Sequence, residues 1–155
     1  MIAIGGWNEG AKSYSQMVAD DANRATFVDS VMAFLEEHEF DGLDLDWEYP
    51  ADWTRGGQAQ DKDNFVKLVD ELSEKFKPKG YLLSAAVSAA ESKIRAGYDV
   101  PRLAAKFDFI NVMTYDLRGF WDRRTGHHSP LSRAIGEDPW SETAKLNSVN
   151  QFTIL

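Results

Sequence analysis

Three acidic residues, Asp44, Asp46 and Glu48, stand two positions apart in the stretch GLDLDWEYP, and apolar residues separate them. Because alternate residues of a β-strand point to opposite faces, the carboxyl groups would share one face, with neighbours about 6.6 Å apart along the strand. Carboxyl groups held this close cannot all ionise freely, so the pKa of at least one must rise. A carboxylic acid that keeps its proton near neutral pH can protonate a leaving group, so the spacing predicts general acid catalysis.

Two other interpretations of these acids remain open. The first is a solvated strand face, although the middle of a covered parallel strand has no such face. The second is a Ca²⁺ or Mg²⁺ site, as in a metal-dependent phosphatase-like α/β protein, although the apolar spacers do not fit a calcium-binding loop. His127 and His128 are adjacent, point apart on an extended chain and lack a third ligand. We therefore expect loop histidines and no metal site.

Four apolar segments and three amphipathic segments must position the acids. The apolar segments predict strands, and the segments with helical spacing of apolar residues predict helices. The predicted strands are Ile2–Gly6, Phe40–Asp46, Tyr81–Ser88 and Phe107–Thr114, the predicted helices are Asn23–Glu39, Asp61–Phe76 and Val100–Lys106, and Glu48–Asp61 is a predicted loop. This alternation is typical of βαβ units with a parallel sheet, so a doubly wound sheet and a (β/α)₈ barrel are both possible.

Length and charge limit the classes of partner. The chain has 155 residues, 43% of them hydrophobic, as in one ordinary globular domain. The formal net charge of −8 and the lack of a Lys/Arg-rich stretch argue against nucleic acid and anionic membrane surfaces as partners. No cysteine is present for a disulfide or a thiolate. No apolar run approaches the ~20 residues of a membrane span, and the first residues lack the features of a signal peptide.

Together, four motifs resemble a known family. Asp41-x-x-Asp44-x-Asp46-x-Glu48, followed by Tyr49-Pro50, resembles the signature of family 18 glycoside hydrolases, the chitinases. The stretches Ala3-Ile4-Gly5-Gly6-Trp7, Ser84-Ala85-Ala86 and Met113-Thr114-Tyr115-Asp116 resemble the motifs of the family's third, fifth and sixth strands. The resemblance covers roughly residues 1–135 and is closest to the arthropod chitinases. It implies a TIM (β/α)₈ barrel of the chitinase type, about half present, with strands three to six.

The resemblance also implies a chemistry and roles for the polar residues. It implies retaining hydrolysis of β-1,4-linked N-acetylglucosamine, in which the substrate's own acetamido oxygen is the nucleophile, without a cofactor. Glu48 would be the general acid and later the general base. Asp46 would orient the acetamido group and stabilise the intermediate's charge, and Asp44 would share a proton with Asp46. Tyr115 would hydrogen-bond the acetamido group on its oxygen side.

Five further residues would contact substrate. Trp7, Tyr49 and Trp121 would stack on sugar rings, since aromatic faces pack on the apolar C–H surface of sugars. Met113 and Asp116 would shape the floor of the subsite where the bond breaks. Packing in the core is the competing interpretation for the aromatic residues, and for Trp47 it is the preferred one. The expected partners are chitin or N-acetylglucosamine oligomers, and the expected location is extracellular.

The chain also departs from the family. A (β/α)₈ barrel usually needs ~200–250 residues, so residues 1–155 are expected to be a partial catalytic domain. The tail 142–155 does not resemble the sixth helix of the family, and Ala3 replaces a serine of many members, a mild change. Open sheet edges are expected to make the isolated chain poorly stable, prone to associate, and inactive or very weakly active. A chitin-binding lectin of the same fold is the alternative.

Overall fold

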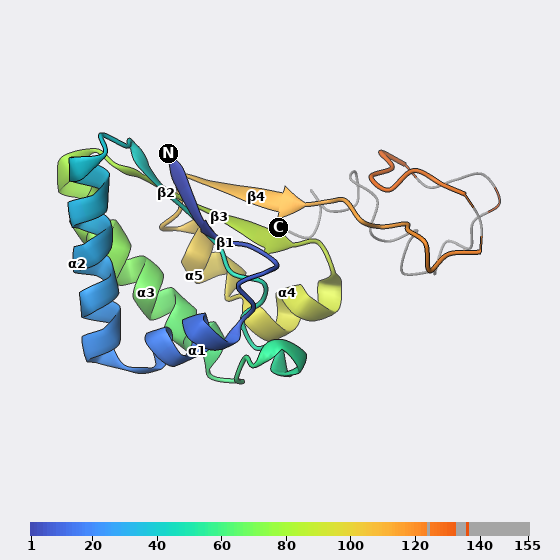
Figure 1. The fold of residues 1–155 in the computed structure, drawn as a ribbon, viewed down its shortest axis with the longest axis horizontal. Coiled ribbons are helices and arrows are strands. Elements are labelled where there is room, and N and C mark those ends of the chain that lie inside the picture. Colours follow the sequence, from blue (N-terminus) through green and yellow to red (C-terminus); the bar gives the residue numbers. More distant parts are fainter. Residues whose placement is uncertain (124, 133–135, 137–155) are drawn as a thin grey trace.

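A computed structural model describes residues 1–123, 125–132 and 136 of the chain. The sheet has four parallel strands in chain order, β1 (Ile2–Gly5), β2 (Gly42–Asp46), β3 (Leu82–Ser88) and β4 (Phe109–Met113) (Figure 1). In its register, Asp44 of β2 stands opposite Ala3 of β1 and Ser84 of β3. The prediction of a parallel sheet is confirmed, and each predicted strand end lies within two residues of the strand end in the structure.

The helices include three predicted elements and two that the periodicity did not predict. The predicted ones are α2 (Asp21–Glu37), α3 (Asp61–Phe76) and α5 (Val100–Ala104), and the additional ones are α1 (Lys12–Ala19) and α4 (Glu91–Gly97). One short 3₁₀ turn, Trp53–Arg55, lies between β2 and α3, and a second, Lys77–Lys79, comes directly after α3. Neither additional helix has a side-chain hydrogen bond at its N-cap. They are held by packing on the rest of the fold, which a short polar sequence does not reveal.

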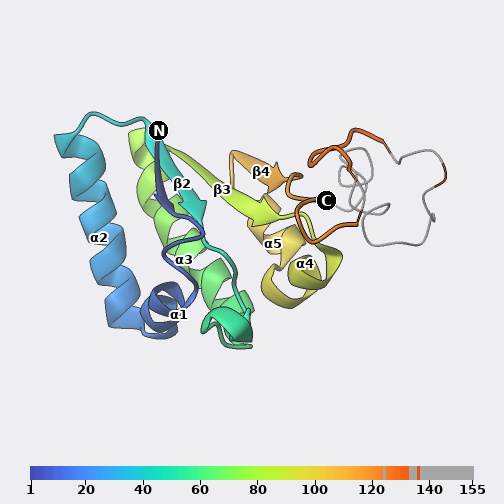
Figure 2. The ribbon, with the colours of Figure 1, turned by 45° about the vertical axis from the view of Figure 1, so that its right-hand side comes forward.

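All of these helices lie on one side of the sheet (Figures 1 and 2). The core fills the space between, where Leu43, Leu45 and Trp47 of β2 and its extension are at most 3% exposed. Trp47 stacks on Tyr14 of α1 and meets Phe65 of α3 edge to face. The structural interpretation of Trp47 is therefore confirmed. In the described residues, the face of the sheet that carries the acids has no helix over it.

The two outer strands leave apolar surface open. An apolar groove of about 420 Å³ follows the outer edge of β1 and the adjacent side of α2. Beyond β4, residues 114–123 and 125–132 run away from the sheet (Figure 1). In the described part of the chain, no helix combines the length and the apolar character needed to cross a bilayer.

Candidate active site

The acids of β2 lie on the uncovered face of the sheet, as their alternation predicts. Asp44 accepts a hydrogen bond of 2.5 Å from the Ser84 hydroxyl and one of 3.2 Å from the side-chain amide of Asn111. Three adjacent strands therefore contribute to one polar cluster. Glu48, two residues beyond the end of β2, is only 8% exposed, so its carboxyl group is held within the protein.

Asp46 shows the electrostatic consequence of this crowding. Burial, then the charge of Glu48, then the charge of Asp44 raise the pKa of Asp46 to about 6. The prediction that at least one carboxyl group has a raised pKa is confirmed. The Oδ1 atom of Asp46 is buried and has no hydrogen-bond partner among the described residues. This oxygen can accept a hydrogen bond from a bound molecule.

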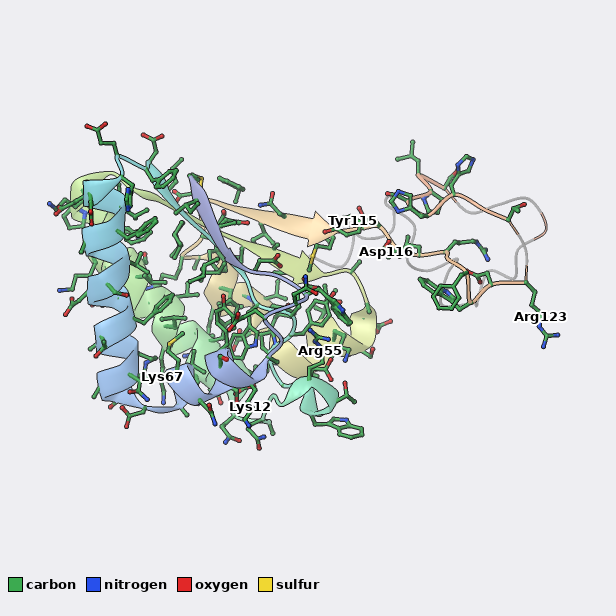
Figure 3. All side chains as sticks on the ribbon, in the orientation of Figure 1. Lys12, Arg55, Lys67, Tyr115, Asp116 and Arg123 are labelled. Atoms are coloured by element: carbon green, nitrogen blue, oxygen red, sulfur yellow. The ribbon has the colours of Figure 1, made fainter. Side chains whose placement is uncertain are left out.

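Two tyrosines lie in the electrostatic field of these acids. Burial and then the Glu48 carboxylate raise the pKa of Tyr49, which follows Glu48 across a cis peptide bond. Burial, then Asp46, Glu48 and Asp116 raise the pKa of Tyr115. Figure 3 shows Tyr115 just beyond the end of β4. Both phenols therefore stay protonated near neutral pH and can donate hydrogen bonds at the site.

The loop after Glu48 is held by two buried acids. Asp61 is fully buried and accepts hydrogen bonds from the Ser15 hydroxyl and from the backbone N–H groups of Ala51 and Gln58. Asp52 pairs with Lys93 of α4 at 2.5 Å. Burial opposes the ionisation of Asp52, yet Lys93 and Thr54 hold its pKa below the usual range. The loop is thus anchored to α1, α3 and α4, and these anchors fix the path of the chain beyond Glu48.

Trp7 follows a tight turn that brings the end of β1 against the end of β2. Gly5 and Gly6 have φ of +113° and +98°, and Gly6 N–H donates to the Asp46 carbonyl at 2.8 Å. A Cβ on Gly5 would stand 2.2 Å from the Asp46 carbonyl oxygen, so only glycine fits there. Beyond this turn, the Trp7 side chain is 58% exposed. The guanidinium of Arg55 lies 3.5 Å from the centre of its ring.

The remaining predicted contact residues lie at or beyond the end of β4. Met113 is half-buried and pairs with Ser88. Asp116 is exposed, has φ of +54°, and donates its backbone N–H to Nδ1 of His128 at 3.4 Å. Trp121 is exposed and contacts Phe120 edge to face, in the segment that leaves the sheet (Figure 2).

The structure therefore gathers part of the predicted set. The charges of Asp44 and Glu48 help to raise the pKa of Asp46, and the charges of Asp46 and Glu48 help to raise the pKa values of Tyr49 and Tyr115. These five side chains therefore lie together at the carboxyl end of the sheet, whereas Trp121 lies in the segment beyond β4. Trp140 and the tail 142–155 lie outside the described residues. The described residues contain no group of three or more acidic, histidine or cysteine side chains arranged to hold a metal ion.

Two residues of the site were missed by sequence reasoning. Asn111 lies two positions before Met113 on the same strand face, so alternation could have found it. Arg55 lies in the loop after β2 and carries no local signal, since its partners are 48 and 7 residues away along the chain.

Fold and site together define a class: a parallel α/β protein with a partly buried cluster of carboxyl groups at the carboxyl end of its strands. The model of the glycosyl hydrolases family 18 matches residues 1–153, and the chain belongs to that family. It is 48% identical over 149 residues to an endochitinase of Manduca sexta, covering 95% of this chain and 26% of that relative. The family prediction, including the likeness to arthropod chitinases, is confirmed.

Solved structures agree with this assignment. The Group IV chitinase of Ostrinia furnacalis, solved with allosamidin, is 42% identical with a TM-score of 0.90, covering 98% of this chain and 41% of that one. Human YKL-39, described as a pseudo-chitinase with retained chitooligosaccharide binding, is 33% identical with a TM-score of 0.84, covering 99% of this chain and 42% of that one. The fold is therefore part of a chitinase-type barrel, as predicted, and the chain spans less than half of each of these solved chains.

Proposed function

We propose that the whole protein hydrolyses the β-1,4 linkages between N-acetylglucosamine units of chitin, by a retaining mechanism in which the substrate supplies the nucleophile. Glu48 is the general acid and base. The observation that carries this proposal is that Glu48 is buried beside Asp46. The charge of Glu48 helps to raise the pKa of Asp46 to about 6. A buried carboxyl group next to a second acid is the arrangement that general acid catalysis needs.

The first step breaks the glycosidic bond. Glu48 donates its proton to the glycosidic oxygen while the acetamido oxygen of the same substrate attacks the anomeric carbon. The bond from that carbon to the leaving oxygen breaks, and an oxazolinium ion forms with its positive charge on the acetamido group. Asp46 accepts a hydrogen bond from the acetamido N–H through its unpartnered buried oxygen and stabilises that charge. Tyr115 donates a hydrogen bond to the acetamido group on its oxygen side.

The second step restores the enzyme. Glu48, now a carboxylate, takes a proton from water, and the water oxygen attacks the anomeric carbon on the face that the leaving group occupied. The carbon–oxygen bond of the oxazolinium opens and the acetamido group is regenerated. Asp44 shares a proton with Asp46 and is itself oriented by Ser84 and Asn111. Trp7, Tyr49 and Trp121 stack on sugar rings, and Met113 and Asp116 line the cleavage subsite.

The test compares the whole protein with its Glu48→Gln variant on N-acetylglucosamine oligomers. Hydrolysis should fall by about 10²–10⁴-fold, the usual contribution of a general acid, while calorimetry shows that oligomer binding remains. Glu37→Gln, at the exposed end of α2, is the matched control and should hydrolyse normally. Proton NMR during turnover should show the β-anomer as the first product, since two displacements retain configuration. Normal turnover by Glu48→Gln would contradict the assignment.

A second candidate function is binding without hydrolysis. It is favoured by the likeness to YKL-39, which is described as binding chitooligosaccharides as a pseudo-chitinase. Retention of an acid at position 48 argues for the enzyme instead. Oligomer binding without turnover by the wild-type protein would establish the lectin function.

In either case we propose that the protein acts outside the cell, where chitin is exposed. Secretion assays of the whole protein would test this location.

A further inference from the structure

We propose that Arg55 is a positioning residue that ties the sugar-stacking indole of Trp7 to the backbone of the general acid Glu48. The inference rests on the proposed function, because it assigns a role within that same site. It is carried by three contacts that one guanidinium makes to two segments far apart in the sequence. The side chain comes from the loop after β2 and lies near the carboxyl end of the sheet (Figure 3).

The three contacts use different parts of the guanidinium. Its Nε donates a hydrogen bond to the backbone carbonyl of Glu48 at 2.9 Å. A terminal nitrogen donates to the backbone carbonyl of Trp7. Its central carbon, Cζ, lies over the Trp7 ring, 3.5 Å from the ring centre. A planar cation with several N–H donors can make all three contacts at once, whereas a lysine ammonium cannot both stack and donate in two directions.

Hydrogen bonds fix the backbone of the turn that carries Arg55. Arg55 lies in a 3₁₀ turn that begins after Asp52, and its backbone N–H donates to the Asp52 carbonyl at 3.0 Å. Its own carbonyl accepts from the N–H of Ala11 at 3.3 Å, which joins the loop to the segment after Trp7. Asp52 is in turn fixed by Lys93. The backbone from which the Arg55 side chain extends is therefore fixed by contacts other than those with Trp7.

This arrangement gives the indole two different faces. One face is covered by the guanidinium, and since the side chain is still 58% exposed, the other face is open to a sugar ring. A cation on the far side of the ring also restricts the indole to one orientation. Because the same cation holds the Glu48 carbonyl, the distance between the stacked sugar and the proton donor is fixed by one residue. Misplacement by about 1 Å can cost on the order of 10²-fold in rate.

The test uses Arg55→Met and Arg55→Gln in the whole protein, with Arg95→Met as the matched control. Arg95 is an exposed arginine on α4 whose side chain pairs with Glu91 four residues earlier. We expect Arg55→Met to raise KM for oligomers by about threefold to tenfold, the range of a lost cation–π support, and to lower kcat by about tenfold or more. In a Trp7→Ala background, Arg55→Met should leave KM unchanged and still lower kcat.

A readout without substrate separates this inference from the proposed function. In protein labelled with 5-fluorotryptophan, the ¹⁹F resonance of Trp7, assigned by its loss in Trp7→Phe, should shift in Arg55→Met and Arg55→Gln but not in Arg95→Met. If the wild type hydrolyses nothing, the proposed function fails while this spectrum still tests the contact. The inference is overturned if the Trp7 resonance does not move in either variant. It is also overturned if both Arg55 variants match Arg95→Met in kcat and KM on an active enzyme.

Discussion

The hydroxyl of Ser84 donates a hydrogen bond to the carboxylate of Asp44, and the two residues stand opposite each other in the register of β2 and β3. Ser84 is fully buried, whereas Asp44 is partly exposed. The orientation of the innermost acid is thus set by the neighbouring strand. Ala3 stands opposite Asp44 on the other side and offers no side-chain donor.

Removing this hydroxyl should weaken both the fold and the reaction. Ser84→Ala leaves the partly buried carboxylate of Asp44 with one donor fewer, which should cost about 1 kcal/mol of unfolding free energy. Because Asp44 shares a proton with Asp46 in the proposed mechanism, kcat should fall more than KM rises. Denaturant titration and oligomer kinetics measure the two effects. Ser30→Ala, on an exposed position of α2, is the control, and equal behaviour of the two variants would refute the role of the bond.

The raised pKa of Asp46 predicts a specific pH dependence of stability. Between pH ~4, the usual pKa of an unfolded aspartate, and pH 6, the folded state holds a proton that the unfolded state has lost. The contribution of Asp46 to stability therefore falls as pH rises through this window. Asp46→Asn should be more stable than wild type at pH 7, by up to ~1 kcal/mol after solvent screening, and the gain should vanish below pH 4.

Thermal melts of Asp46→Asn and wild type between pH 4 and 8 measure this difference. Asp29→Asn, a change of an exposed aspartate on α2, should run parallel to wild type across the range. A constant offset between Asp46→Asn and wild type at all pH values would argue against a proton held at Asp46.

The turn after β1 should tolerate no side chain at its first glycine. Gly5→Ala places a methyl group 2.2 Å from the Asp46 carbonyl and 2.6 Å from the Tyr14 hydroxyl, at φ of +113°. The clash and the backbone strain together should cost about 3 kcal/mol or more. Gly80→Ala shares a positive φ of +72° but meets nothing within 4 Å, so it should cost only about 1 kcal/mol. Unfolding titrations compare them, and equal losses would show that strain alone matters.

The buried anchor Asp61 should matter far more than its neighbour on the same helix. Asp61→Ala leaves the Ser15 hydroxyl and two backbone N–H groups without their acceptor, which should cost about 3–5 kcal/mol. Asp63→Ala loses only a surface pair with Arg102, worth about 0–1 kcal/mol. Hydrogen exchange of residues 49–58 should quicken in the Asp61 variant alone, and protection in that loop would count against its anchoring role.

The edges of the sheet predict how the isolated 155-residue polypeptide behaves. Ile4 on β1 and Phe109 on β4 are 37% and 45% exposed beside strand edges that no other described strand covers. Exposed apolar edges pair with other chains, so the polypeptide should self-associate at micromolar concentration. The double change Ile4→Lys and Phe109→Lys should reduce the sedimentation coefficient toward that of a monomer. A monomeric wild-type polypeptide in the same run would overturn this expectation.

The sequence predicted the parts of the fold that follow from periodicity. Alternation in β2 placed Asp44 and Asp46 on one face and Leu45 on the other, because the period of a strand is two. It could not predict α1 or α4, since these short helices depend on packing rather than on capping or strong periodicity. Gly97, for example, ends α4 where a Cβ would stand 2.5 Å from the carbonyl oxygen of Pro50, a contact between distant segments.

The site divides in the same way. The acids follow one another in the chain, so their cluster could be predicted from local spacing. Arg55 and Asn111 join the site through partners 48 and 67 residues away, and those contacts exist only once the strands are paired. The family motifs, however, did indicate that the site lies at the carboxyl end of the strands.

The alternation of β2 also constrains how this protein can change over evolutionary time. Leu43, Leu45 and the two aspartates share one five-residue strand, so inserting or deleting a single codon would rotate both sets at once. The leucines would then face away from the core, and the carboxyl groups would face into it. Insertions and deletions are therefore not tolerated in this strand, and we expect new substrate preferences to arise in the loops that follow the strands.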